Sequence, residues 1–166
     1  LMPTNLYGPC DNYNPLDSHV LPAFINKFWE AKEKQLNSVT CWGTGKVLRE
    51  FLFVDDLAEA CLFALENWDL KSVDAPKDKN NKPLLWLNVG SDYEISIENL
   101  AKKIAKIVGF HGQIFWDNKK PDGTPRKKLS TRRMKNLGWE SRTSLDQGIK
   151  KTIKYYQKDF NNKTLR

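Results

Sequence analysis

The side chains best suited to chemistry in this sequence are a histidine and an arginine within its first fifty residues. His19 carries an imidazole, the side chain that most often removes or returns a proton in catalysis. Taken alone, this residue is explained more simply as one that hydrogen-bonds a loop at a predicted helix start. Arg49 has a planar guanidinium that matches phosphate oxygens. Proton transfer and phosphate binding are therefore the kinds of chemistry that these residue types allow.

A basic cluster follows in the second half of the chain, which has a net charge of +7. Such a cluster could bind nucleic acid, hold the diphosphate of a nucleotide sugar, or form a solvated face. Charge alone does not decide between them, and nucleic acid is the least favoured. The cluster consists of Lys119, Lys120, Arg126, Lys127, Lys128, Arg132, Arg133 and Lys135.

The cysteines do not indicate a metal site. Cys10, Cys41 and Cys61 are odd in number and lack C-x-x-C or zinc-ligand spacing, so we expect reduced thiols in a cytoplasmic protein. Cys41 and Cys61 are expected to be small core residues. No apolar run approaches the roughly 20 residues needed to cross a bilayer. No metal and no membrane partner is therefore expected.

The elements that must position these residues form a mixed α/β unit with short strands and about five helices. Pro22 is expected in the first turn of a helix that begins near Ser18. A second helix, capped by Asp55 or Asp56, is expected to bury the stripe Leu57, Cys61, Leu62 and Leu65. Strands are expected at 1–7, 39–42, 49–54, 84–89 and 113–116, further helices after Ser96, at 131–137 and after Ser144, loops at 11–17 and 67–83, a turn at 121–125 and fraying at 161–166.

Four stretches of the sequence resemble one known family over about residues 2–160. The chain resembles the C-terminal part of the GDP-L-fucose synthases, which belong to the extended short-chain dehydrogenase/reductase superfamily. Arg-Glu-Phe and Val-Asp-Asp occur across many sugar-nucleotide epimerases and indicate only the superfamily, whereas the last stretch is the most family-specific. The stretches are Pro-Thr-Asn-Leu-Tyr-Gly-Pro at 3–9, Ser-His-Val-Leu-Pro-Ala at 18–23, Arg-Glu-Phe-Leu-Phe-Val-Asp-Asp at 49–56 and Lys-Pro-Asp-Gly-Thr-Pro-Arg-Lys at 120–127.

The resemblance implies both a fold and a reaction. The fold would be the C-terminal substrate-binding part of an α/β, Rossmann-type fold with most of the dinucleotide-binding core missing, over residues 1–160. The complete enzyme would use NADPH to epimerise GDP-4-keto-6-deoxy-D-mannose at C3 and C5 and to reduce it at C4, giving GDP-L-fucose. It would be a homodimer in the cytoplasm.

The resemblance also implies roles for particular residues. His19 would be the acid partner in epimerisation, paired with a cysteine outside this chain, and would also contact the cofactor. Pro3, Thr4, Asn5 and Leu6 would lie along the nicotinamide. Lys27, Trp42, Arg49 and Asp122 would bind the GDP-sugar in one cleft shared with His19, and Arg126 is a further phosphate candidate.

Two features that hydride transfer requires are missing from the sequence. The nearest match to a Gly-rich phosphate turn is Gly43-Thr44-Gly45, where Leu48 takes the place of the third glycine. No tyrosine is followed four residues later by a lysine. We therefore expect a truncated chain that is inactive alone and exposes apolar surface where the other half would pack. Cys10 and Phe53 stand where many relatives have histidine.

Two other interpretations stay open at this point. The chain could belong to another nucleotide-sugar epimerase or dehydratase. It could also be a non-catalytic nucleotide-sugar-binding module.

Overall fold

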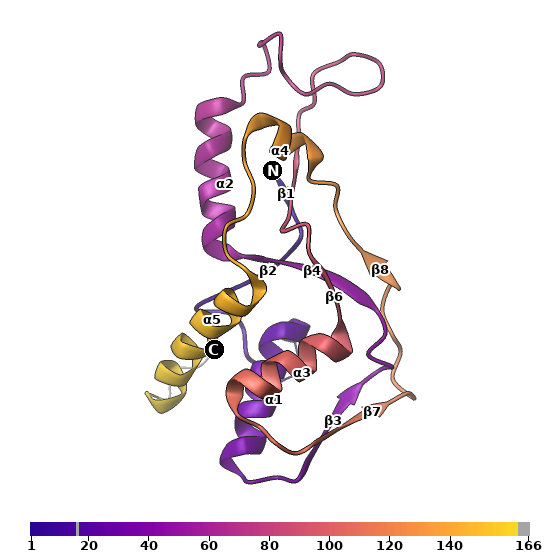
Figure 1. Ribbon diagram of the computed structural model, residues 1–166, viewed down its shortest axis with the longest axis vertical. Coiled ribbons are helices and arrows are strands. Elements are labelled where there is room, and N and C mark those ends of the chain that lie inside the picture. Colours follow the sequence, from indigo (N-terminus) through magenta and orange to yellow (C-terminus); the bar gives the residue numbers. More distant parts are fainter. Residues whose placement is uncertain (16, 163–166) are drawn as a thin grey trace.

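The computed structural model describes residues 1–15 and 17–162, which form an elongated α/β arrangement with helices at both ends and short strands between them (Figure 1). The described residues contain the five helices that the sequence predicts. In chain order the elements are β1 (Met2–Pro3), β2 (Asn5–Tyr7), α1 (Val20–Glu33), β3 (Ser38–Trp42), β4 (Leu48–Phe53), α2 (Val54–Asn67), β5 (Asn88–Val89), β6 (Glu94–Ser96), α3 (Ile97–Val108), β7 (Gln113–Asp117), β8 (Arg126–Lys127), α4 (Arg132–Leu137) and α5 (Leu145–Asn161).

Strand β4 is the centre of the largest sheet. Its first half pairs antiparallel with β6 and parallel with β8, and its second half pairs parallel with β2. Since β6 occupies one edge of β4, strands β8 and β2 follow one another along the opposite edge. Two further parallel pairs, β1 with β5 and β3 with β7, complete the described strands.

Both faces of β4 are buried, because successive side chains of a strand point to opposite sides. Phe51 and Phe53 belong to the larger hydrophobic cluster, which α1, α3 and α5 cover. Leu52 belongs to a second cluster, formed mainly with α2, α4 and β5. The strand therefore joins two separate cores, one in each half of the molecule (Figure 1).

The helix ends follow the capping signals that the sequence carries. Ser96 accepts a hydrogen bond from the amide of Asn99 at the start of α3. Ser144 and Gln147 form the predicted capping box of α5. Gly109 and Gly138 end α3 and α4 in the left-handed conformation that glycine adopts without a Cβ clash. α1 starts two residues later than expected, so His19 becomes its N-cap residue.

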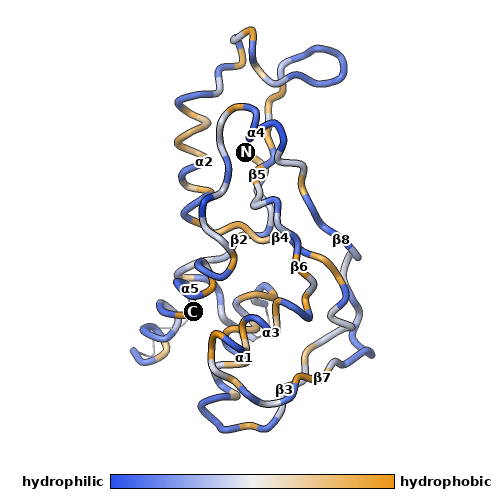
Figure 2. The backbone as a smooth tube through the Cα atoms, in the orientation of Figure 1, coloured by the Kyte–Doolittle hydropathy of each residue, from blue (hydrophilic) through white to orange (hydrophobic). Residues whose placement is uncertain are grey.

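The predicted interior stripe of α2 is confirmed only at Leu57, which packs against the second cluster, and is wrong at Cys61, Leu62 and Leu65. Leu62 is 62% exposed, Leu65 is 85% exposed and Cys61 is also exposed, whereas Ala60 and Asp56 are buried. Figure 2 shows hydrophobic residues recurring along α2, but a periodic pattern does not say what covers each face. Leu62 and Leu65 therefore form exposed apolar surface on this helix.

The start of α2 also differs from the prediction. The helix begins at Val54 with Phe53 as its N-cap, and neither Asp55 nor Asp56 caps it. The carboxylate of Asp56 instead accepts hydrogen bonds from the amides of Arg142 and Thr143 and from the Thr143 hydroxyl. The Asp56 side chain, which local spacing assigned to a helix cap, thus bonds a segment that is distant in the sequence.

The strand expected over 84–89 is reduced to Asn88–Val89, because β1 offers only two residues for pairing. Leu85 and Trp86, expected inside, are 70% and 58% exposed. The expected loop at 67–83 is confirmed apart from the last turn of α2. Residues 163–166 of the expected frayed tail lie outside the described residues. Among the described helices, none combines the length and hydropathy that crossing a bilayer requires.

A close contact between α5 and β2 fixes the strand that leads to the candidate site. A Cβ atom added at Gly148 would overlap the hydroxyl of Tyr7 and come within 2.7 Å of its Cζ. Tyr7 is buried, so the ring has little room to move.

Replacing Gly148 with alanine should therefore destabilise the fold by about 1–3 kcal/mol through overpacking, although alanine favours a helix by about 1 kcal/mol. Urea unfolding measures the change. The double variant Tyr7→Phe with Gly148→Ala removes the hydroxyl and should recover part of the loss. An unchanged or higher stability in Gly148→Ala would contradict the contact.

Candidate functional site

A cavity of about 830 Å³ lies where the N-terminal strands end. One wall is formed by residues 3–8 of β1, β2 and the turn after them. The facing wall is residues 126–129, the strand β8 and its continuation. Cys10, Asp11 and His19 also line it. Segments more than 100 positions apart in the sequence thus meet around one cavity.

His19 lines this cavity and is also the N-cap residue of α1. It is exposed, and its side chain makes no capping hydrogen bond although it holds the N-cap position. The His19 side chain therefore does not cap α1. Burial raises the pKa of the Asp11 carboxyl, while the Asn12 amide and nearby His19 oppose that rise. An imidazole and a carboxylate thus lie close together at the cavity.

Two side chains of the wall formed by residues 3–6 are already hydrogen-bonded within the fold. The Thr4 hydroxyl and the Asn5 side-chain amide both donate to the carbonyl of Glu50, at 3.2 and 2.8 Å. The amide of Thr4 donates to the carbonyl of Val89. Pro3, Thr4, Asn5 and Leu6 therefore present a rigid strand end to the cavity.

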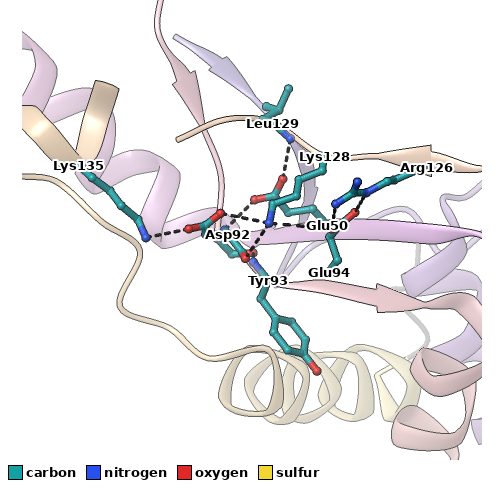
Figure 3. A network of polar contacts seen from close by, with 9 residues as sticks. Glu50, Asp92, Tyr93, Glu94, Arg126, Lys128, Leu129 and Lys135 are labelled. Atoms are coloured by element: carbon teal, nitrogen blue, oxygen red, sulfur yellow. Dashed lines mark hydrogen bonds and ion pairs between the residues drawn. The ribbon is translucent and has the colours of Figure 1, made fainter. Parts of the chain in front are cut away.

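The facing wall is held by ion pairs (Figure 3). Arg126 donates two hydrogen bonds to Glu94, at 2.8 and 2.6 Å, so its fork is already engaged. Lys128 and Lys135 both pair with Asp92, at 3.3 and 2.9 Å. Arg126 and Lys128, two of the basic residues at this wall, are thus paired with carboxylates within the fold.

Lys27 and Trp42 line a different cavity, of about 600 Å³, between α1 and β3. Lys27 donates to the carbonyl of Thr40 at 2.9 Å. Trp42 is 67% exposed and has the ammonium of Lys120 5.2 Å from its ring centroid. An exposed aromatic surface with a cation above it can accept a flat ring or a sugar face.

Arg49 and Asp122 line neither cavity. Asp122 belongs to residues 120–129, which run from one cavity to the other, and Arg49 of β4 hydrogen-bonds that segment. Arg49 donates from Nη1 to the carbonyls of Leu48 and Thr124, at 2.7 and 2.6 Å. Asp122 accepts from the amide and the hydroxyl of Thr44, at 2.8 and 2.6 Å. These two contacts fasten the 120s loop to β4 and to the turn after β3.

The expectation of one shared cleft is therefore corrected. The structure brings His19 together with residues 3–6, separates Lys27 and Trp42 from them, and leaves Arg49 and Asp122 between the two groups. The physical reason is the course of residues 120–129, which run from Trp42 past Thr44 and Arg49 to the larger cavity.

Glu50 is the residue at this site to which the sequence assigned no role. It is fully buried, and its carboxylate accepts hydrogen bonds from the amides of Asp92 and Leu129, at 2.7 and 3.0 Å. The sequence signal was an acidic residue directly before the apolar run Phe51 to Val54 of a predicted buried strand, a position that requires polar partners.

The thiols of the chain have different environments. Burial raises the pKa of the Cys41 thiol to about 11, so this side chain stays protonated at neutral pH and is the expected core residue. Cys10 is exposed and adopts a φ of 62°. Cys61 is exposed, so the prediction of a core residue was wrong there. Over residues 1–15 and 17–162, no group of three or more His, Cys, Asp or Glu side chains is placed to hold a metal ion.

Comparison with known proteins gives one family and several relatives. A model of the NAD dependent epimerase/dehydratase family matches residues 1–75. GDP-L-fucose synthase 1 of Arabidopsis thaliana is 44% identical over 162 residues, which are 98% of this chain and 46% of that protein. GDP-L-fucose synthase of Escherichia coli (strain K12) is 42% identical over 94% of this chain and 47% of its own length.

A solved structure supports the same relationship. The GDP-L-fucose synthetase of Naegleria fowleri bound to NADP superposes with a TM-score of 0.80 at 28% identity, over 97% of this chain and 47% of that one. The chain thus spans about half the length of the relatives that it matches. The expected resemblance and fold class are confirmed.

The hydrogen bonds at Asp122 give a titration that tests the loop geometry. The two hydrogen bonds from Thr44 hold the pKa of the Asp122 carboxyl below its ordinary value. Since the pKa is lowered in the folded state, this contribution to stability is present at neutral pH. It is lost as the pH falls through the folded pKa.

Replacing Thr44 with valine removes the hydroxyl donor and should raise the pKa of Asp122 toward its ordinary value, as followed by carbon NMR of the carboxyl. Thr44→Ser keeps the donor and should keep the lowered pKa. The same titration curve in wild type and Thr44→Val would show that the hydroxyl does not bind Asp122.

Proposed function

Because this chain is a relative of the GDP-L-fucose synthases within the NAD dependent epimerase/dehydratase family, we propose that it is the substrate-binding part of an NADPH-dependent 3,5-epimerase/4-reductase. Its substrate would be GDP-4-keto-6-deoxy-D-mannose and its product GDP-L-fucose. The observation that carries this proposal is His19, an uncapped and exposed imidazole in the same cavity as Pro3, Thr4, Asn5 and Leu6.

His19 would act as the acid in epimerisation. Inverting a carbon next to a ketone needs one group to remove a proton and another to return a proton on the opposite face. An imidazole that titrates near neutrality can return that proton. As the family resemblance implies, the base would be a cysteine outside this chain; of the thiols described here, Cys10 lines the cavity of His19, whereas Cys41 and Cys61 line neither cavity.

The GDP moiety would be held along the segment between the two cavities. Within the described residues, Arg49 makes its hydrogen bonds from Nη1 and keeps Nε and Nη2 for phosphate oxygens. Lys27 would add a point charge, Trp42 an aromatic surface and Asp122 its remaining lone pairs. Binding of the GDP moiety by these residues would hold the keto-sugar in the correct position relative to His19.

The cavity fits one end of a dinucleotide cofactor. The strand end at residues 3–6 offers backbone groups to a nicotinamide amide, whereas the described residues provide no Gly-rich turn leading into a helix for the pyrophosphate. NADPH, when bound, would supply the hydride for reduction at C4. Since this chain covers about half of its relatives, we propose that it is inactive alone and acts in a cytoplasmic homodimer when joined to a dinucleotide-binding half.

Nucleotide preference tests the substrate class. The chain should bind GDP more tightly than UDP or dTDP in titration calorimetry. Arg49→Lys loses the planar fork and should weaken GDP binding about tenfold, which corresponds to ~1.4 kcal/mol. Arg142→Lys is the same change at an exposed arginine away from both cavities and should have no effect. Equal affinity for the three nucleotides would point to another nucleotide-sugar enzyme.

Solvent exchange tests the role of His19. In a protein that joins this chain to the dinucleotide-binding half of a relative, His19→Asn should abolish deuterium exchange at C3 and C5 of the keto-sugar. GDP affinity should change little, because the imidazole lies at the sugar end.

The outcome against this role is equal exchange in both proteins. The 166-residue chain alone serves as the control and should not oxidise NADPH. Turnover by the chain alone would remove the premise that hydride transfer needs a second half.

A further inference from the structure

Glu50 is a buried carboxylate whose position the hydrophobic core does not explain. Glu50 has no exposed surface. It belongs to β4, whose following residues pack into two apolar clusters. Removing a charge from water is costly unless hydrogen bonds compensate. Here the compensation comes from backbone amides, since Oε1 accepts from Asp92 and Oε2 accepts from Leu129.

The place of Glu50 along β4 explains its reach. Strand β8 pairs with Leu48 and Arg49, and strand β2 pairs from Phe51 onward, on the same edge of β4. Glu50 therefore stands where one neighbouring strand leaves that edge and the next one joins it. The two walls of the larger cavity diverge from this point.

Each wall is tied to Glu50 by a different group. The backbone carbonyl of Glu50 accepts from the Thr4 hydroxyl and from the Asn5 side-chain amide. Its carboxylate holds the facing wall through the amide of Leu129. One residue thus contacts both sides of the cavity.

A second layer reinforces the facing wall (Figure 3). Asp92 donates its amide to Glu50 while its own carboxylate pairs with Lys128 and Lys135. The loop before Asp92 approaches closely only because residue 90 is glycine. A Cβ atom there would overlap Oε1 of Glu50 and lie 2.9 Å from its Cδ.

We propose that Glu50 is a positioning residue that sets the separation between residues 3–6 and residues 126–129, and thereby the placement of the GDP-binding segment 120–129 relative to His19. This inference rests on the proposed function for the identity of the ligand. It goes beyond that function because Glu50 touches neither substrate nor cofactor and acts through backbone amides.

The carboxylate is needed because two donors face it. A glutamine has the same shape but accepts at one atom only, so one of the two amides would meet an NH₂ group. The wall at Leu129 or the loop at Asp92 would then move away, and the ion pairs of Asp92 would move with it.

The test uses the 166-residue chain with Glu50→Gln and the matched control Asp56→Asn. Asp56 is likewise a buried carboxylate that accepts two backbone amides, but it anchors residues 142–143 away from the cavity. Both variants should lower the urea midpoint. GDP affinity by calorimetry should fall about tenfold in Glu50→Gln and stay unchanged in Asp56→Asn.

A second readout does not depend on the ligand. Amide hydrogen exchange in Glu50→Gln should speed up at Asp92 and Leu129, whose amides donate to the carboxylate, and not at Thr4–Asn5, whose side chains bond the unchanged backbone carbonyl. In Asp56→Asn it should speed up at 142–143 alone. If wild type binds no GDP, the proposed function fails, while the exchange pattern still decides the role of Glu50. Equal loss of GDP affinity in the two variants, or wild-type exchange at Asp92 and Leu129 in Glu50→Gln, would overturn the inference.

Gly90→Ala provides a route that keeps the charge, should Glu50→Gln not fold. The added methyl displaces the carboxylate from Asp92 and should reproduce both the loss of GDP affinity and the faster exchange at Asp92 and Leu129. Wild-type values in Gly90→Ala would also overturn the inference.

Discussion

The structure depends on a single strand, β4, that is buried on both faces and paired on both edges. Phe51 and Phe53 pack into one cluster and Leu52 into the other, so a slip of one residue in register would exchange the side chains between the two cores. The two halves of the molecule are thereby fixed relative to one another. The cavity that contains His19 lies at the edge of this strand, where β8 and β2 succeed one another.

The polar groups near the site mostly serve one another. Asp122 holds the turn at Thr44, Arg49 holds the loop at Thr124, and Arg126 is engaged by Glu94. These contacts reduce the freedom of the 120s segment before any ligand arrives, which lowers the entropy cost of binding. Within the basic cluster that the sequence predicts as an anion site, Arg126, Lys128 and Lys135 are paired in the fold with the carboxylates of Glu94 and Asp92.

Local signals predicted local structure well. The capping box at Ser144, the cap at Ser96 and Gly138 at the end of α4 lie where the sequence places them, because each depends on neighbours within four residues. The prediction for α2 failed for the opposite reason. Its apolar spacing is genuine, but Leu62 and Leu65 face outward, since burial is a property of the surrounding elements rather than of the helix.

The sequence by itself determined the family resemblance, the α/β class and the identity of the candidate residues. Motifs and residue types can be recognised from consecutive residues, so they do not require knowledge of the fold. Only the tertiary structure decided which candidates meet. His19 joins residues 3–6, whereas Lys27 and Trp42 line a separate cavity. It also gave Glu50 and Asp56 their roles, because their partners lie 42 to 87 positions away and no spacing in the sequence indicates them.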